Sequence, residues 1–211
     1  TTLGAPNTAV YPVGGMALTE ARYAAIEAGE ETAASITCIP ASEFSGYAGD
    51  MTFDDMPLLT DIGTSSFAGC TGNVTFGDTP LLTGIGTRSF AGCTGNVKFG
   101  ETPRLTSIGQ NSFSGCTGDV SLGAMPQLSS IGSSAFSDFL GVLTIAAGDC
   151  DKLRDIGSSA FRGSSNPASS VTFGSLPALR ALGGYNYQSS VFYRFRGNVT
   201  IVGSLASLAS I

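Results

Sequence analysis

Five cysteines are the side chains whose type is best suited to chemistry, and three of them recur at a fixed spacing. Cys70, Cys93 and Cys116 follow one another at steps of 23 residues, with Cys38 and Cys150 outside the series. Stacked about 5 Å apart they would lie within disulfide range, but three thiols cannot all pair, and side chains of one column point the same way. A straight row also lacks the tetrahedral arrangement that zinc requires. We therefore expect buried free thiols that pack as small apolar side chains, and no metal site.

Carboxylates form a second recurring set. The set comprises Asp55, Asp78 and Glu101. Three interpretations stay open: a solvated row, which we favour, a weak cation or partner contact, or a catalytic pair of the glycosidase type. The chain has no histidine, so the commonest general base is missing, and nothing in the sequence separates the acidities of two carboxylates. We expect no enzyme and no cofactor. A pocket that brings Glu43 or Asp54 against a second carboxylate would reverse that expectation.

A row of mostly hydroxyl-bearing residues occupies the middle of a repeated apolar-x-apolar segment. Its members are Thr52, Thr75, Lys98, Ser121, Thr144, Thr172 and Thr200. Because side chains alternate along a strand, the row should face outward. It offers a surface for a protein or glycan partner, although threonine on an exposed strand also reflects β-propensity alone. The candidate partner-binding residues of this row are Thr75, Lys98, Ser121, Thr144 and Thr172.

Aromatic and basic residues gather near the C-terminus. The group comprises Tyr185, Tyr187, Tyr193, Arg194 and Arg196. Tyrosine and arginine are the residues that anchor interfaces and stack on sugars, so this group is a second candidate partner-binding patch. The alternative is that residues 185–196 fold over the last repeat as a cap. The neighbouring Phe192 and Phe195 fall in repeat columns and are expected in the core.

The elements that position these residues follow from an internal repeat. Segment 60–82, TDIGTSSFAGCTGNVTFGDTPLL, is followed by two close copies, and the 23-residue step relates Phe67, Phe90 and Phe113. The step extends back to Phe44 and forward to Phe136, with extra residues around 149–150, 164–166 and 184–189. Each unit predicts two short strands and a tight helical or 3-10 turn, with Thr-Gly-Asn turning the chain back into a strand. One unit buries too little to fold alone, so stacked units must share a core, in which we expect Phe67, Phe90, Phe113 and Phe136 to stack along one axis.

The period and the columns resemble the BspA-like branch of the leucine-rich repeat family. The resemblance lies in I-G-T-S-S-F-A-G-C and its copies and covers roughly residues 34–211. It implies a curved solenoid on the cell surface or in the extracellular space, which binds proteins or other cells. We predict a right-handed, mostly β solenoid of about seven 23-residue coils. The Val74-x-Phe76 strand departs from the usual Leu-x-x-Ile spacing.

The two ends of the chain carry different expectations. Residues 1–33 lie outside the repeat and predict a capping helix that starts after Thr19 and stops at Gly29, with Tyr23 and Ile26 facing the first coil. Residues 34–211 form the solenoid. The apolar rhythm continues through the last residues, so the final coil is closed either by residues 185–196 or by another chain, which would make a homodimer.

Charge excludes some classes of protein. With 10 basic against 16 acidic residues the net charge is -6, which argues against a nucleic-acid partner. The charge is uneven: residues 1–61 contain nine acids and one base, and residues 152–211 contain six bases and one acid. No apolar run reaches the ~20 residues of a membrane span, and a signal peptide is absent or already removed. We favour an extracellular or surface-anchored adhesion module. The alternative is a structural element that assembles end to end.

Overall fold

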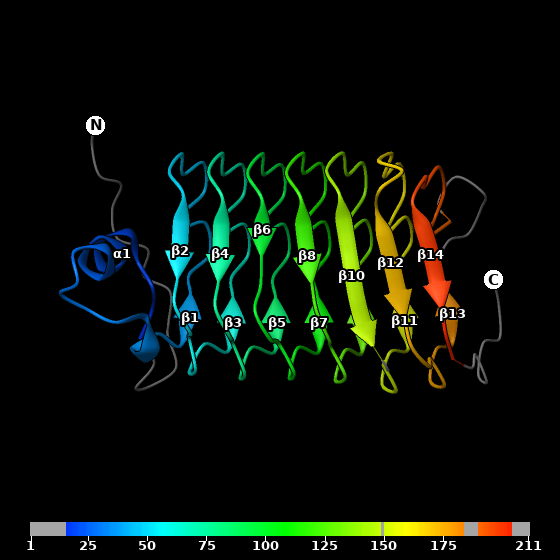
Figure 1. Cartoon of the computed structure of the whole chain (residues 1–211), viewed down its shortest axis with the longest axis horizontal. Coiled ribbons are helices and arrows are strands. Elements are labelled where there is room, and N and C mark those ends of the chain that lie inside the picture. The colour runs from blue at the N-terminus through cyan, green and yellow to red at the C-terminus, as the bar shows by residue number, and fades with distance from the viewer. Residues whose placement is uncertain (1–15, 149, 184–189, 204–211) are drawn as a thin grey trace.

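The computed structural model describes residues 16–148, 150–183 and 190–203, and they form a solenoid of parallel strands (Figure 1). Each coil contributes one strand to each of two seven-stranded sheets. Sheet A contains β1 (Cys38–Ile39), β3 (Asp61–Ile62), β5 (Gly84–Ile85), β7 (Ser107–Ile108), β9 (Ser130–Ile131), β11 (Asp155–Ile156) and β13 (Ala181–Leu182). Sheet B contains β2 (Met51–Phe53), β4 (Val74–Phe76), β6 (Val97–Lys98), β8 (Val120–Leu122), β10 (Leu143–Gly148), β12 (Ser170–Phe173) and β14 (Asn198–Ile201).

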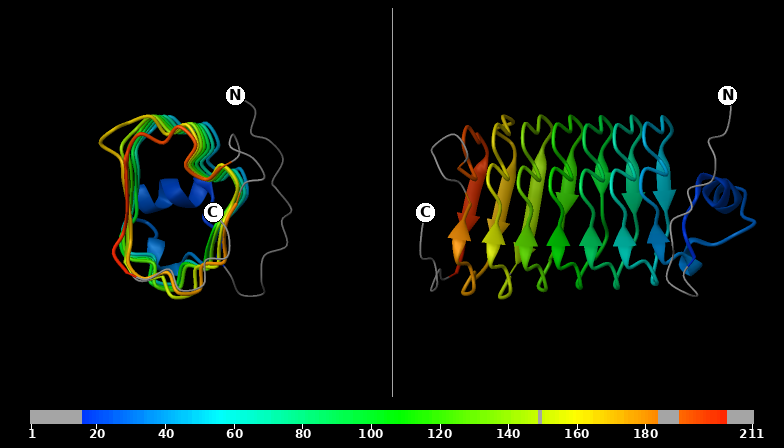
Figure 2. Two further views of the ribbon diagram at one scale, coloured as in Figure 1. Left: turned by 90° about the vertical axis from the view of Figure 1, so that its right-hand side faces the viewer. Right: turned by 180° about the vertical axis from the view of Figure 1, so that it is seen from behind.

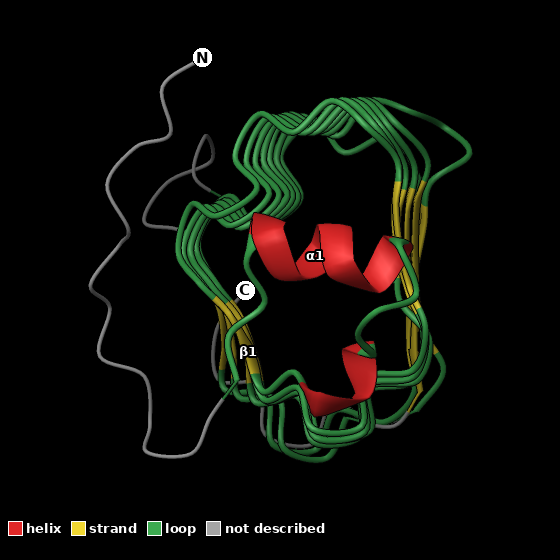
Figure 3. Cartoon of the chain, turned by 90° about the vertical axis from the view of Figure 1, so that its left-hand side faces the viewer, coloured by secondary structure: helices red, strands yellow, loops and turns green. Residues whose placement is uncertain are grey.

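The strand register follows the 23-residue step through the regular coils. In sheet A, Ile39 pairs with Ile62 and Ile62 with Ile85, and in sheet B Val74 pairs with Val97. The coils are right-handed, because seen from the N-terminal end the chain descends along sheet B and rises along sheet A as it recedes (Figures 1 and 3). The predicted solenoid is confirmed.

The coils form a nearly straight stack rather than the curved one that the resemblance implied (Figures 1 and 2). From residue 38 to residue 203 the described part of the chain contains no helix. A helix is about 10 Å wide, whereas neighbouring strands are about 4.8 Å apart. Helices on one side of the solenoid would therefore separate successive coils more on that side and curve the stack. Here strands lie on both sides, so neither side is wider.

Two columns of rings fill the interior. The longer column stacks face to face at centroid separations of 5.0–5.2 Å, with interplanar angles of 1–8°. Its members are Phe44, Phe67, Phe90, Phe113, Phe136, Phe161 and Phe192. A shorter column, Phe53, Phe76 and Phe99, meets the first edge to face. The predicted internal phenylalanine stack is therefore confirmed, and phenylalanine is needed because a smaller side chain would leave a cavity in every coil.

The turn before each sheet B strand, predicted as helical or 3-10, consists of two consecutive tight turns with 3-10-type bonds and no continuous helix. In one coil the Ala68 N–H donates to the Ser65 carbonyl (3.1 Å) and the Cys70 N–H donates to the Phe67 carbonyl (3.2 Å). The alternate residues, Phe67 and Gly69, donate their N–H groups to carbonyls of the next coil at 2.7 and 2.8 Å. Positive φ angles at Ser65 (56°) and Gly69 (72°) rotate these peptides toward the neighbour. Bonding alternates within and between coils, which explains why no helix forms.

The N-terminal helix α1 (Glu20–Glu27) covers the open end of the first coil (Figure 3). Thr19 caps it by accepting the Arg22 N–H, and it ends before Gly29, where φ is 74°. Tyr23 is buried, with its ring 5.2 Å from that of Phe53. Ile26 is half-buried against the same core. The predicted limits and inward face of the helix therefore agree with the structure.

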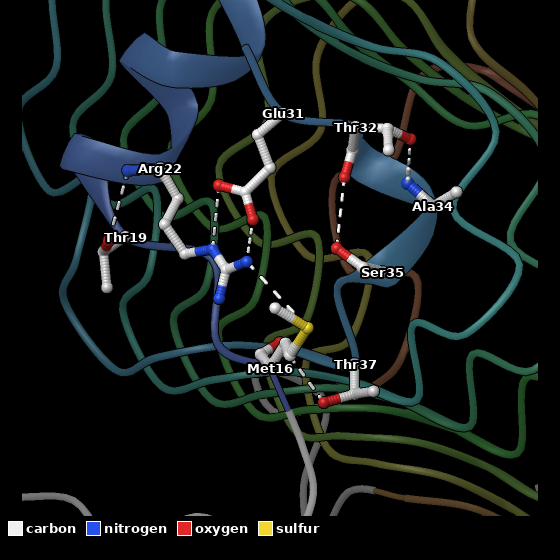
Figure 4. Close-up of polar contacts among 8 residues, drawn as sticks. All are labelled: Met16, Thr19, Arg22, Glu31, Thr32, Ala34, Ser35 and Thr37. Atoms are coloured by element: carbon white, nitrogen blue, oxygen red, sulfur yellow. Dashed lines mark hydrogen bonds and ion pairs between the residues drawn. The ribbon is translucent and has the colours of Figure 1, made fainter.

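Two further contacts hold this end of the chain. Ala17 forms a parallel bridge with Cys38, which extends sheet A by one residue. Arg22 pairs with Glu31 beyond the helix, beside the Thr32 cap of the 3-10 turn η1 (Ala33–Ser35) (Figure 4).

Candidate binding surface

The outward row on sheet B is continuous through the first five coils. Backbone pairing places Thr52 beside Thr75, Thr75 beside Lys98, Lys98 beside Ser121 and Ser121 beside Thr144. All five side chains lie on the outer face while the residues on either side point into the core. Neighbouring members are therefore one strand spacing apart, about 4.8 Å.

The row does not continue to Thr172, which corrects the sequence register. Thr144 pairs with Ser170, whereas Thr172 pairs with Ala146 and with Thr200. The cause is the extra residues in the connection between β10 and β12, since Thr144 and its partner Ser170 are 26 rather than 23 residues apart. Thr172 still faces outward, but it lies two residues further along its strand than Ser170, which is the residue beside Thr144.

Three predicted residues meet at a shallow hollow on this face. Lys98, Ser121 and Thr144 line a depression of about 280 Å³ together with Asn96 and Asp119. Lys98 is exposed, and the residues around it are short, so its ammonium group is the most prominent charge there. The hollow is open and polar at its rim, which suits contact with a surface better than enclosure of a small substrate.

Asparagine and aspartate side chains at the edge of this hollow form a ladder that the sequence analysis missed. The side chains of Asp50, Asn73, Asn96 and Asp119 each accept the N–H of the equivalent residue one coil later, at 2.7–2.9 Å. The 23-residue recurrence of Asp or Asn was visible, but we assigned it to turn conformation alone. These groups hold coils together and are not free to bind a partner through the bonded oxygen.

The side chains of the acidic column also join successive coils. Asp55 accepts the N–H of Asp78 and Asp78 accepts that of Glu101, both at 2.8 Å. The side chains are exposed, in agreement with a solvated row, and the bonds explain why the column persists. Glu43 accepts the N–H of Glu20 at 3.0 Å, which places it at the helical cap.

The cysteines are free thiols, as predicted, and four of the five are buried. Cys70, Cys93 and Cys116 each donate to a phenylalanine carbonyl of the preceding coil at 2.9–3.0 Å. The neighbouring Cys116 thiol, together with burial, raises the pKa of Cys93 to about 12. The thiol of Cys93, followed by burial, likewise raises the pKa of Cys70. The raised pKa values keep Cys70 and Cys93 protonated near neutral pH, and their hydrogen bonds to the preceding coil make these thiols structural. No group of metal-binding side chains occurs within the described ranges.

The C-terminal candidates are partly brought together. Tyr185 and Tyr187 lie outside the described residues. Tyr193 is half-buried, and the Arg194 guanidinium lies 5.1 Å from its ring centroid. Phe192 and Phe195 pack against the core, as expected for their columns.

A second hollow, of about 530 Å³, adjoins this group. Arg194 and Arg196 line it with four residues that the sequence analysis did not single out: Asp138, Arg162, Gly163 and Ser165. The available signal was Asp138, which replaces the glycine of its repeat column. The arginines that line the hollow with Asp138 come from later coils, where inserted residues break the 23-residue spacing.

Comparison with known proteins identifies the repeat. The model of the BspA type leucine rich repeat region matches residues 37–178 in six copies. No curated protein and no solved structure gives a significant match. Among the described residues no helix has the length and apolar character needed to cross a bilayer.

Proposed function

The chain belongs to the BspA-type leucine-rich repeat family, and we propose that it is a non-enzymatic binding module of the cell surface or extracellular space. Repeat scaffolds of this kind commonly serve surface binding and adhesion. The proposed partner is a protein or a glycan carried by another cell. It contacts the outer face of sheet B through Thr75, Lys98, Ser121 and Thr144, with Thr172 further along the same face. A second contact lies at Tyr193, Arg194 and Arg196. Tyr185 and Tyr187 belong to the same proposed patch.

The observation that carries this proposal is the contrast between inside and outside. Over successive coils the interior position of the long ring column is always phenylalanine, whereas the adjoining outward row reads Thr, Thr, Lys, Ser, Thr. The core therefore repeats while the surface varies. A flat face with varied polar side chains on a rigid backbone suits recognition, because little conformational entropy is lost on binding.

An array of extracellular-matrix proteins and glycans, probed with the purified chain, tests this function. The informative variant is Lys98→Glu, and Arg104→Glu is its matched control, since Arg104 is also exposed but lies off the row. We expect array binding that Lys98→Glu abolishes and Arg104→Glu preserves, with both variants melting like the wild type. Absence of any binding, or equal loss with both variants, would contradict the proposal.

End-to-end assembly is a second candidate function. The edge strand β14 supports it: Val199 and Ile201 are 39% and 38% exposed, although Val171 and Phe173, their partners in β12, are buried. The acidic first third and basic last third of the chain add an attraction between opposite ends. Sedimentation velocity tests this candidate. A salt-sensitive assembly is expected, and a monomer at every salt concentration would contradict it.

A further inference from the structure

The hollow beside Arg194 is built by three successive connections from sheet A to sheet B. Asp138 lies between β9 and β10, Arg162 and Ser165 lie between β11 and β12, and Arg194 and Arg196 lie between β13 and β14. Backbone hydrogen bonds join these connections: Asp138 N–H to the Arg162 carbonyl (2.6 Å), and Gly163 N–H to the Tyr193 carbonyl (2.8 Å). The charged side chains therefore project from a backbone whose position is fixed.

Its charge is strongly positive. Three guanidinium groups face one carboxylate, and all four side chains are exposed. Within residues 16–148, 150–183 and 190–203, the single ion pair is that of Arg22 and Glu31, at the opposite end of the solenoid. None of the three arginines is therefore paired with a carboxylate within those ranges. Their three positive charges and the single negative charge of Asp138 leave an excess that a dianion would balance.

The backbone at this hollow supplies an independent observation. One repeat column adopts a left-handed conformation with φ of 70–75° and is occupied by glycine at residues 46, 69, 92, 115 and 163. In the coils on either side of Gly163 the same column holds Asp138 (φ 53°) and Arg194 (φ 57°). Six further non-glycine residues, in another column, adopt a left-handed φ of 54–59°, so the conformation alone does not mark a site. What distinguishes the hollow is that Asp138 and Arg194 replace the glycine on either side of Gly163 and place two charged side chains there.

Gly163 fits the same arrangement. A Cβ atom added there would collide with the Asp138 carboxylate, so the Asp138 side chain extends over Gly163 toward the arginine-bearing coil. Glycine at this position therefore leaves room for a carboxylate to lie beside the three guanidinium groups.

We propose that this hollow binds a tetrahedral oxyanion, namely a phosphate or sulfate group. Guanidinium forks match such oxygens with paired N–H donors, and the Ser165 hydroxyl can add another donor. A dianion would balance the excess charge. The volume of about 530 Å³ exceeds that of the ion itself, so the hollow has room for a group that carries the ion, such as a sugar, as well as for the free ion. The inference rests on the proposed function only in treating Arg194 and Arg196 as recognition residues.

Isothermal titration of the full chain with inorganic phosphate, inorganic sulfate, glucose 6-phosphate and glucose 6-sulfate tests the proposal, with sodium chloride at about physiological strength to screen diffuse attraction. We expect saturable binding, weakened roughly tenfold or more by Arg162→Gln, Arg196→Gln or Arg194→Gly, since each removes charge-assisted hydrogen bonds. Tighter binding of the esters supports a sugar-borne group, and equal binding identifies the free ion as the ligand.

Two further variants separate this site from other causes. Arg194→Gly restores the residue that the column holds elsewhere, so it should melt at the same or a higher temperature while binding is lost; misfolding then cannot explain the loss. Arg180→Gln removes an exposed positive charge outside the hollow and should leave affinity within about twofold. The proposal is overturned if no ligand binds, or if Arg180→Gln weakens binding as much as the hollow variants. Array binding that survives Arg194→Gly would leave the sheet B function intact.

Discussion

The regular coils (residues 40–131) and the C-terminal coils (residues 132–203) share one stack of phenylalanines but differ in what their polar side chains bond to. In the regular coils, Asp50 and its equivalents accept N–H groups of the next coil, and Thr60, Thr83 and Thr106 donate to carbonyls of the preceding one. The asparagine and aspartate ladder makes its last bond to Val142. Beyond it, Arg162, Arg194 and Arg196 surround a hollow without forming an ion pair to any carboxylate that the structure describes.

The difference teaches that one architecture can assign stability and recognition to separate side chains. Where the repeat is regular, the ladder residues and the threonines before each sheet A strand join coils, and the outward row of sheet B is left for a partner. Where insertions and substitutions break the repeat, the ladders stop and charged side chains become available. Departures from the repeat thus mark a second candidate binding site, in addition to the outward row of sheet B.

Removing a ring from the regular part should have the largest effect. Phe90→Ala leaves a cavity between two stacked rings and should lower the free energy of unfolding by about 3–5 kcal/mol. Phe195→Ala, in the C-terminal coils, should cost about 2 kcal/mol because Phe195 is only half-buried. Guanidinium chloride unfolding monitored by circular dichroism measures both. Equal losses would mean that the two regions contribute alike to stability.

A reciprocal exchange at the left-handed column should have the next largest effect. Gly92→Arg adds a Cβ atom that meets no other atom within 4 Å, so backbone strain is the main cost, and a loss of about 1–2 kcal/mol is expected. Arg194→Gly should change stability in the opposite direction, by up to about 1 kcal/mol because glycine also loses backbone entropy. Differential scanning calorimetry should show melting temperatures that move apart. A fall with both variants would remove the strain argument.

Breaking one ladder bond should have a smaller effect. Asp78→Ala removes the acceptor of the Glu101 N–H and should cost about 1 kcal/mol, whereas Asp78→Asn keeps an acceptor oxygen and should cost less. Asp151→Ala, an exposed aspartate of the C-terminal coils, is the matched control and should change stability by less than about 0.5 kcal/mol. Urea unfolding distinguishes these values, and an Asp151→Ala cost equal to that of Asp78→Ala would contradict the division between regions.

The free energy of unfolding should stay unchanged as the pH rises from neutrality to about 9, and it should fall only above pH 9. The pKa of Cys93 is raised to about 12 from 9.0 by its neighbouring thiol and burial, and burial raises that of Tyr23 from 10.0 to about 12. Because the folded pKa lies above the unfolded one, the stabilisation is complete below pH 9 and is lost as pH rises toward 12. Unfolding free energies measured across this range check the sign. A rise in stability above pH 9 is the contrary result.

Sequence periodicity was sufficient for the core and insufficient for the C-terminal site. Phe67, Phe90 and Phe113 repeat because each must stack on the last, so their spacing reports a contact directly. Thr172 was wrongly predicted to follow Thr144 in the outward row, because residues inserted in a connection shift the strand register without changing the local sequence pattern. The meeting of Asp138 with Arg162 and Arg194 depends on turns of unequal length, and no fixed spacing encodes it.

Amide hydrogen exchange of the full chain, with and without phosphate, tests the division between scaffold and recognition most directly. We predict that the amides of Phe67, Phe90 and Phe113 exchange only through global unfolding, and that those of Phe195 and Asn198 exchange through smaller openings. Phosphate should slow exchange around residues 138, 162–165 and 193–196 while leaving the regular coils unchanged. Uniform protection along the solenoid, with no local response to phosphate, would contradict the account.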